Sequence, residues 1–241
     1  MSQQRNGQDG NSTEIEQTAK HLILCEGPDD RDFLNSYLHT IFSDKPDFLN
    51  SVQIMPLNGV SKLRSRVVAL KSMKRFKHLQ SLLVIRDADN NPASAMDNVQ
   101  GAFRDAGLPV PDAPHTWKQD QTLKIGFLLF PSCNECLEAG ALENLCLQIL
   151  SETNSEDVIH EIDQLIVSLQ EHCRRDFRHR DKSRLYTYFA THDVYIDKMR
   201  IGRVAQSGGF NWNSPKLEPL KNFLLELADS PADDKDNKKG S

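Results

Sequence analysis

Short apolar runs alternate along this chain with longer stretches in which apolar residues recur every three or four positions. Short apolar runs are typical of strands, and the longer recurrence is typical of amphipathic helices. The pattern predicts strands at 22–25, 52–57, 82–89 and 125–131. It predicts a helix after each of them, at 28–42, 61–73, 92–106 and 141–150. Because parallel strands need crossover connections, this alternation predicts an α/β fold, a mainly parallel sheet with helices on both faces.

The second half of the chain has a different pattern. Beyond residue 151 the strand signal fades, and helices are predicted at 158–173, 182–190 and 220–228. No Gly- or Ser-rich linker separates the two parts, so we expect an α/β domain at 21–150 with a helical C-terminal part at 151–229 packed on it.

Both ends of the chain are polar. Residues 1–20 are rich in Gln, Asn, Gly and Ser, and residues 230–241 are dominated by charged and small residues. Such segments bury too little apolar area to offset the entropy of ordering them. We therefore expect disordered tails at 1–20 and 230–241.

Charge narrows the classes of partner. The 241 residues contain 38% hydrophobic residues, enough for a full core, and carry a net charge of −5 with a pI near 5.9. This balance argues against nonspecific wrapping of nucleic acid, so any contact with it must be local. Two basic runs are candidates, and for each a solvated helix face and a phosphate-binding surface stay open. The runs are Lys71, Lys74, Arg75 and Lys77, and then Arg174, Arg175, Arg178, Arg180, Lys182 and Arg184.

Cysteine usage points to a reducing compartment. Five cysteines and no apolar signal region make a disulfide framework improbable, and we expect a cytoplasmic protein. Cys133 and Cys136 have the spacing of a zinc or redox pair. No second such pair completes a tetrahedral zinc site, so this use is disfavoured. No run approaches the roughly 18 apolar residues that a membrane-spanning helix needs.

The strongest chemical signal is a set of carboxylates after two predicted strands. Glu26 follows the strand at 22–25, and Asp87 and Asp89 end the run at 82–89. Open α/β sheets bind ligands beyond the carboxyl ends of their strands, and carboxylates there suit a hard cation such as Mg²⁺. Neighbouring carboxylates also repel each other unless a cation or a proton intervenes. The trio therefore predicts a metal site.

Other acidic residues nearby have a simpler interpretation. Asp29, Asp30 and Asp32 lie in the first turn or two of the helix that Pro28 begins, where carboxylates complement the helix dipole. We interpret these three as structural.

A strand ending in Glu26-Gly27, followed two elements later by a strand ending in Asp87-x-Asp89, resembles the Toprim superfamily. Within it, the chain is similar to a small bacterial Toprim-like family of uncharacterised function, related to nucleases of the overcoming-lysogenisation-defect type. Asn58-Gly59 after the second strand, the stretch 127–150 and the region from 182 extend the resemblance to about residues 20–228.

The resemblance implies a mechanism. Asp87 and Asp89 would hold one or two Mg²⁺ or Mn²⁺ ions, and Glu26 would act as a metal ligand, as a general base, or as both. Glu143 resembles an additional metal ligand of the nuclease-type proteins, although an exposed helix glutamate is an equal alternative. Lys182 would supply a cation to the transition state.

Two glycines and one asparagine complete the comparison with Toprim proteins. Gly27 and Gly59 would let the backbone approach a ligand or phosphate closely. Asn91 stands where some Toprim proteins have a third aspartate, which puts a topoisomerase-like arrangement of two metals in doubt. The chain is also too short for a topoisomerase or a primase.

Two classes of function follow from the resemblance. The first is a Mg²⁺-dependent nuclease acting on DNA or RNA as the effector of an ATPase-associated complex in defence against phage or in repair, with self-association left open. The second is a non-catalytic Toprim-like module that binds a metal, a nucleotide or a protein segment. A phosphotransferase of the haloacid-dehalogenase type is less favoured, because it places Asp-x-Asp after its first strand.

Overall fold

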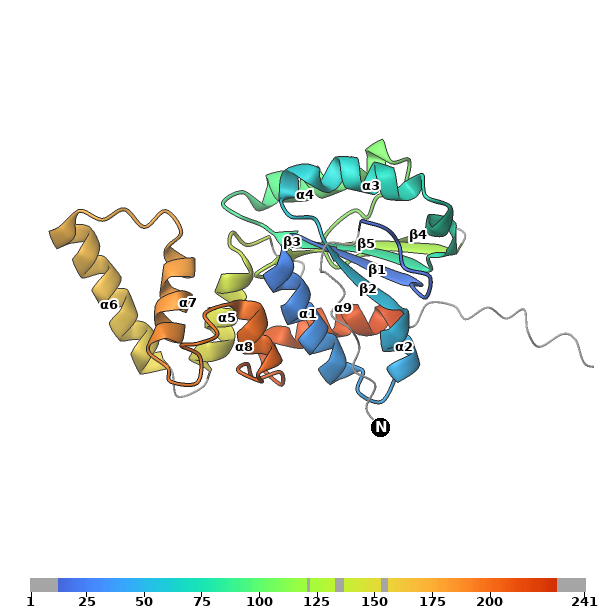
Figure 1. Ribbon diagram of the computed structural model, residues 1–241. Coiled ribbons are helices and arrows are strands. Elements are labelled where there is room, and N and C mark those ends of the chain that lie inside the picture. The colour runs from blue at the N-terminus through green and yellow to red at the C-terminus, as the bar shows by residue number, and fades with distance from the viewer. Residues whose placement is uncertain (1–12, 121, 133–136, 153–155, 229–241) are drawn as a thin grey trace, which may run out of the picture.

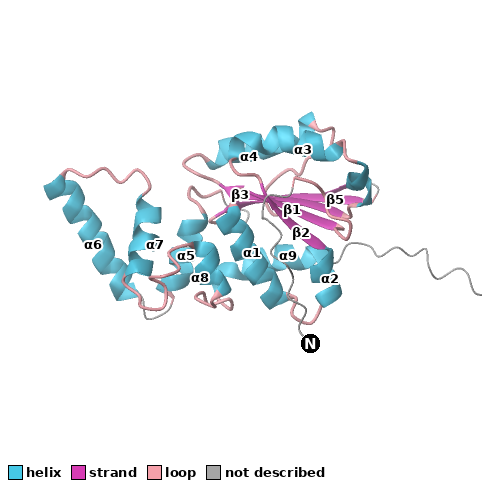
Figure 2. Ribbon diagram, in the orientation of Figure 1, coloured by secondary structure: helices cyan, strands magenta, loops and turns pink. Residues whose placement is uncertain are grey.

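The computed structural model of the chain describes residues 13–120, 122–132, 137–152 and 156–228. A five-stranded sheet forms its centre, with helices over both faces and a pair of helices projecting at one end (Figures 1 and 2). The strands are β1 (His21–Cys25), β2 (Val52–Pro56), β3 (Ser81–Asp87), β4 (Trp117–Asp120) and β5 (Leu123–Phe130).

The order of strands in the sheet is β2-β1-β3-β5-β4. The pairs β1–β2, β1–β3 and β3–β5 are parallel, and β4 pairs antiparallel with β5 at one edge. The predicted α/β class, a mainly parallel Rossmann-like sheet, is confirmed. Strand β4 was missed because its sequence, WKQD, is polar and mostly exposed, so it has no apolar run.

Four helices connect the parallel strands or follow them closely. They are α1 (Pro28–Ile41), α2 (Pro46–Ser51), α3 (Leu63–Lys71) and α4 (Pro92–Asp105). Figure 1 places α3 and α4 over one face of the sheet and α1 and α2 on the other. Each face has its own apolar core, so alternate residues of β1 contribute to different cores: Ile23 belongs to one and Leu24 to the other. Burial on both faces explains why the strands read as continuous apolar runs.

The remaining helices follow the sheet in the chain. They are α5 (Leu142–Ser151), α6 (Glu156–Cys173), α7 (Arg180–Ala190), α8 (Ile201–Gln206) and α9 (Glu218–Ala228). The long helices were predicted, whereas α2 and α8, with six residues each, are too short to show a helical period.

C-terminal residues complete the core on the α1 face. Phe223 of α9 stacks on Trp117 with ring centroids 4.5 Å apart, and a Cβ added to Gly126 would meet both rings within 3 Å. Tyr37 of α1 donates from its hydroxyl to the carbonyl of Leu217 across 3.2 Å. The helices at the end of the chain are thus packed against the sheet, while a domain boundary near residue 150 stays a prediction.

Residues 13–20 pack against the sheet, contrary to the expected disorder up to residue 20. Ile15 and Ala19 are buried, and the Gln53 side chain accepts from the backbone N–H of Glu16 at 3.0 Å. Two buried apolar residues four positions apart and the Gln53 side chain hold this segment on the sheet. The tails 1–12 and 229–241 and the pair Cys133 and Cys136 lie outside the described residues. No helix in the described part of the chain is long and apolar enough to cross a membrane.

Candidate active site at the carboxyl edge of the sheet

Glu26 and Asp87 lie at the carboxyl ends of two neighbouring parallel strands. Glu26 directly follows β1, Asp87 is the last residue of β3, and these strands pair in register at the centre of the sheet. The backbone N–H of Asp87 donates to the Glu26 carboxylate. The other oxygen of Glu26, Oε2, is buried and has no hydrogen-bond partner among the described residues. The strand topology therefore brings together the two acids that the sequence singled out first.

Asp30 is a further carboxylate at this edge. Its Oδ2 accepts from the backbone N–H of Gly27 at 2.8 Å, closing a capping box at the start of α1. The structural role predicted for Asp30 is thus confirmed. Asp30 is also 8% exposed, and its charge interacts with those of Glu26 and Glu143. Sequence analysis missed this second role, although the spacing of four residues from Glu26 across a helix start was a usable signal.

Asp87 and Glu143 meet at the start of α5. Asp87 Oδ1 accepts from the backbone N–H of Leu142 at 2.9 Å, in the first turn of that helix. Glu143 is the next residue, and its charge acts on Asp87, Asp30 and Glu26 alike. The predicted association of Glu143 with this edge is therefore present in the structure, and its role as a ligand stays a prediction.

Burial and mutual repulsion change the acidity of these groups. Burial is the largest cause that raises the pKa of Asp87 well above its usual range, and the charges of Asp30, Glu26 and Glu143 add to it. Burial first, and then the charges of Glu26 and Glu143, raise the pKa of Asp30 to about 7, although the hydrogen bond from the Gly27 N–H lowers it. Burial also raises the pKa of Glu26, which the Arg86 guanidinium partly offsets. Without a cation, the cluster retains protons near neutral pH.

Asp89 is held differently. Its Oδ2 accepts from Nη2 of Arg86 at 2.8 Å, while Arg86 Nε donates to the carbonyl of Asp87 at 2.8 Å. Asp89 has a positive φ of 52°, and its backbone N–H and carbonyl both bond to Gly140 across 2.8 Å. The Arg86 side chain is 6% exposed and that of Asp89 is 61% exposed. Arg86 was missed in the sequence, although a lone arginine inside the run LLVIRD was a visible signal.

Lys182, the predicted catalytic cation, lies next to the cluster. Its Nζ is 3.6 Å from Oε1 of Glu143 and 5.7 Å from the centroid of the Tyr186 ring. The side chain is 58% exposed. Glu143 on α5 and Lys182 on α7, which are 39 positions apart in the chain, are thus neighbours at the site.

The two predicted glycines and Asn91 have identifiable structural tasks. Gly59 has a φ of 116°, which favours glycine, and its N–H donates to the carbonyl of Glu26 at 3.3 Å. Gly27 is extended, and its N–H is taken by Asp30. Asn91 caps α4 by accepting from the N–H of Ser94. Neither glycine N–H is free for a ligand here, so a phosphate-binding role for them stays a prediction.

The donors suit a magnesium ion in kind, but they are not arranged around one. Among the described residues, no group of three or more His, Cys, Asp and Glu side chains has the arrangement of metal ligands. Oxygen donors with raised pKa values and the unpartnered Oε2 of Glu26 match the chemistry of a hard cation. A cation bound to Oδ2 of Asp89 would compete with Arg86, and one bound to Oε1 of Glu143 would compete with Lys182.

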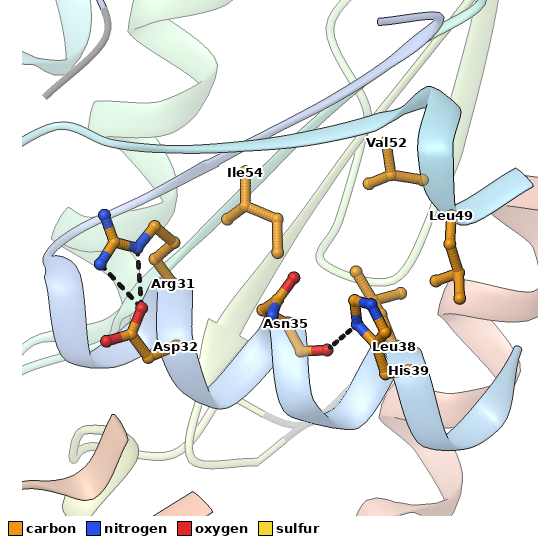
Figure 3. Close-up of a pocket in the computed structure, with 8 residues that line it drawn as sticks. All are labelled: Arg31, Asp32, Asn35, Leu38, His39, Leu49, Val52 and Ile54. Atoms are coloured by element: carbon orange, nitrogen blue, oxygen red, sulfur yellow. Dashed lines mark hydrogen bonds and ion pairs between the residues drawn. The ribbon is translucent and has the colours of Figure 1, made fainter. Parts of the chain in front are cut away.

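Two hollows lie near these elements. One, of about 510 Å³, is polar, and Arg86, Asp89 and Asn91 are among the residues that line it. The other, of about 330 Å³, lies between α1 and the edge strand β2 (Figure 3). Its polar groups are engaged locally, since Arg31 pairs with Asp32 at 2.8 Å. The first hollow adjoins the site through Asp89 and Arg86, whereas Glu26, Asp30, Asp87 and Glu143 line neither hollow.

The fold and this edge define an α/β protein with a Rossmann-like sheet and a buried acidic cluster at its carboxyl end. The chain belongs to the family described as "Protein of unknown function (DUF3226)", which it matches over residues 20–229. A search of the curated proteins finds no match. Among solved structures, the chain is similar to the C-terminal region of the OLD protein of Xanthomonas campestris pv. campestris. That similarity has 14% identity and a TM-score of 0.44, over 87% of this chain and 96% of the other.

Proposed function

We propose that this protein is a Toprim-like, Mg²⁺-dependent nuclease that cleaves phosphodiester bonds in DNA or RNA. The observation that carries the proposal is the juxtaposition of Glu26 and Asp87 on neighbouring parallel strands, within a buried cluster of mutually repelling carboxyl groups. Burying several acids together is costly, and a scaffold has no physical need for it. A site that must attract a divalent cation does have that need.

The residues fall into two groups of roles. Glu26, through its unpartnered Oε2, and Asp87 would be the first ligands of the cation, with Asp89 and Glu143 as further ligands. When bound, Mg²⁺ polarises a phosphodiester and stabilises the charge that builds up on its oxygens. Asp30 lies close enough to influence the charge of this group, and we assign it to the same site.

Proton transfer and charge stabilisation fall to the protein itself. A positioned carboxylate can act as a general base on water. Glu26 therefore suits the task of taking the proton from an attacking water. Lys182, exposed beside Glu143, suits the task of placing a positive charge next to the phosphoryl oxygens.

The net charge of the chain bears on how a substrate would reach the site. A net charge of −5 gives little general attraction for nucleic acid, so a partner that delivers the substrate fits this chain. We propose an ATPase as that partner and the cytoplasm as the compartment.

The test is a cleavage assay with the purified chain on single-stranded DNA, duplex DNA and structured RNA, with Mn²⁺, with Mg²⁺ and with EDTA. The assay is run on the chain alone and with any ATPase that co-purifies. Cleavage that requires the divalent cation supports the proposal. Absence of cleavage under all these conditions rejects it.

A non-catalytic binding module is the second candidate, and one observation favours it. Asp30 caps α1, Asp87 caps α5, and no three such side chains in the described residues form a ready metal site. These acids then have structural duties without catalysis. One result separates the two candidates. Only the binding module predicts that a cation stabilises the protein while no cleavage occurs.

A further inference from the structure

The connection between α6 and α7, together with the start of α7, is one of two strongly basic stretches of this acidic chain. Residues 174–184, which we call the basic connection, contain five arginines, one lysine and two aspartates, whereas the whole chain has a net charge of −5. Figure 1 shows α6 and α7 projecting together at one end of the molecule, joined by this connection. A concentration of positive charge on a projecting element marks a surface for an anionic partner.

Internal ion pairs divide these cations into two sets. Arg184 bonds to Asp163 of α6 at 2.7 Å and to Asp181 at 2.9 Å, which fastens α7 to α6. Arg180 lies 3.8 Å from the same Asp163. Arg178 is 85% exposed and, among the described residues, its one ion-pair partner is the neighbouring Asp176. These three arginines, which already have acidic partners, form the first set, and their task is structural.

The second set is available to a ligand. Arg174 and Arg175 are exposed, and neither forms an ion pair with any residue that the structure describes. Two adjacent arginines without an acidic partner raise the local potential and gain nothing within the fold. Guanidinium groups match phosphate oxygens in geometry and bind them through two parallel N–H donors.

The basic connection leads directly to the candidate site. Lys182, near its end, lies 3.6 Å from Glu143 of the carboxylate cluster. From Arg180, which begins α7, the chain reaches Arg174 over six residues, at most about 20 Å when extended. That upper limit corresponds to at most about six nucleotide steps of 3.4 Å in one strand of a duplex.

We propose that the basic connection binds the sugar-phosphate backbone of a nucleic acid that extends to one side of the bond to be cleaved. Arg174 and Arg175 contact its phosphates, and Lys182 marks the point where the strand meets the carboxylates. The identity of the strand as the cleaved substrate rests on the proposed function, whereas binding by the basic connection does not depend on cleavage. DNA and RNA share this backbone chemistry, and the experiment compares them.

Binding is measured by fluorescence anisotropy in EDTA, where metal-dependent cleavage cannot occur. The probes are labelled 30-nucleotide single strands of DNA and RNA and the matching DNA duplex, each titrated at several salt concentrations. The variant Arg174→Ala/Arg175→Ala is compared with Lys74→Ala/Lys77→Ala. The control removes the same charge from exposed positions before β3, at the opposite end of that strand from the site.

The proposal predicts that only the arginine variant binds more weakly. Each lost phosphate contact lowers the slope of log K against log salt by about 0.9 for a duplex and about 0.7 for a single strand. Loss of two contacts should therefore change the slope by about 1.8 or about 1.4.

Three results would overturn the inference. These are no binding by the unmodified chain, equal weakening by both variants, and binding to phosphatidylserine vesicles that depends on the arginines while binding to the strands does not. Failure of the cleavage assay with intact, arginine-dependent binding would remove the proposed function and leave this inference standing. Cleavage with arginine-independent binding would do the reverse.

Discussion

Nη2 of Arg86 donates to Oδ2 of Asp89 across 2.8 Å, and this ion pair places a nearly buried cation beside a group of carboxylates. The same side chain donates from Nε to the carbonyl of Asp87. Of the charges that act on Glu26, that of Arg86 is the positive one, and it lowers the pKa of Glu26. It compensates the acids that the fold gathers at this edge.

Replacing Arg86 should therefore destabilise the protein more than replacing its partner. Arg86→Met leaves the Asp87 carbonyl without its donor, and an unsatisfied buried group costs about 1–3 kcal/mol. Asp89→Asn loses only the charge of a mostly exposed partner, which contributes about 0–1 kcal/mol. Urea denaturation of both variants measures the difference. Equal losses in the two variants would show that the hydrogen bond to Asp87 is not important.

Stability in EDTA should fall as the pH rises. The pKa of Asp30 is raised to about 7 in the folded protein from about 3.9 in the unfolded chain, so the native state binds more protons between these values. Stability is therefore greatest below pH 4 as far as this group is concerned, and it declines as the pH approaches 7. Asp30→Asn, which keeps an acceptor for the Gly27 N–H, should flatten the decline. Melting temperatures at pH 5 to 8 provide the measurement, and an unchanged slope in the variant would contradict it.

A divalent cation should reverse this loss of stability. Because Mg²⁺ or Mn²⁺ takes the place of protons in the cluster, it should raise the melting temperature more at pH 8 than at pH 6. Binding should also release protons, which calorimetry in buffers of different ionisation enthalpy detects. Asp87→Ala and Asp89→Ala should remove the increment. A protein with no metal-dependent shift at millimolar Mg²⁺ would not have the site that we propose.

The C-terminal helices should unfold together with the sheet. Phe223 is 2% exposed and stacks on Trp117, so Phe223→Ala should cost about 3–5 kcal/mol in a single transition. Asn222→Ala, at an exposed position on the same helix, is the matched control and should change stability by less than about 0.5 kcal/mol. Two separate transitions in the unmodified chain would instead indicate an independent helical unit.

The sequence was sufficient to predict the parallel sheet because its strands are buried on both faces and read as apolar runs. It failed at β4, where WKQD occupies a sheet edge, and in the docking of residues 13–20, which depends on Gln53 from a distant strand. Periodicity describes a segment's own pattern. It does not describe contacts that a segment acquires only when the chain has folded.

The candidate site was predictable to a similar extent. Glu26 and Asp87 were found because topology places the carboxyl ends of neighbouring parallel strands together. Asp30 was assigned only to helix capping, and its proximity to Glu143 depends on how α1 and α5 pack on the sheet. Arg86 was visible as a lone charge inside an apolar run, but its role was missed because that role depends on partners that only the fold brings to it.

The measurement that tests the central claim most directly is the single-turnover rate of cleavage, with saturating Mn²⁺, for two matched variants. Glu26→Gln keeps the shape of the side chain but removes the charge that binds the cation or takes the proton. Glu138→Gln makes the same change at an exposed position to which we assign no role. We predict that Glu26→Gln lowers the rate by about two orders of magnitude or more, with little change in stability, and that Glu138→Gln leaves it nearly intact. A rate for Glu26→Gln equal to that of the unmodified chain would contradict the account.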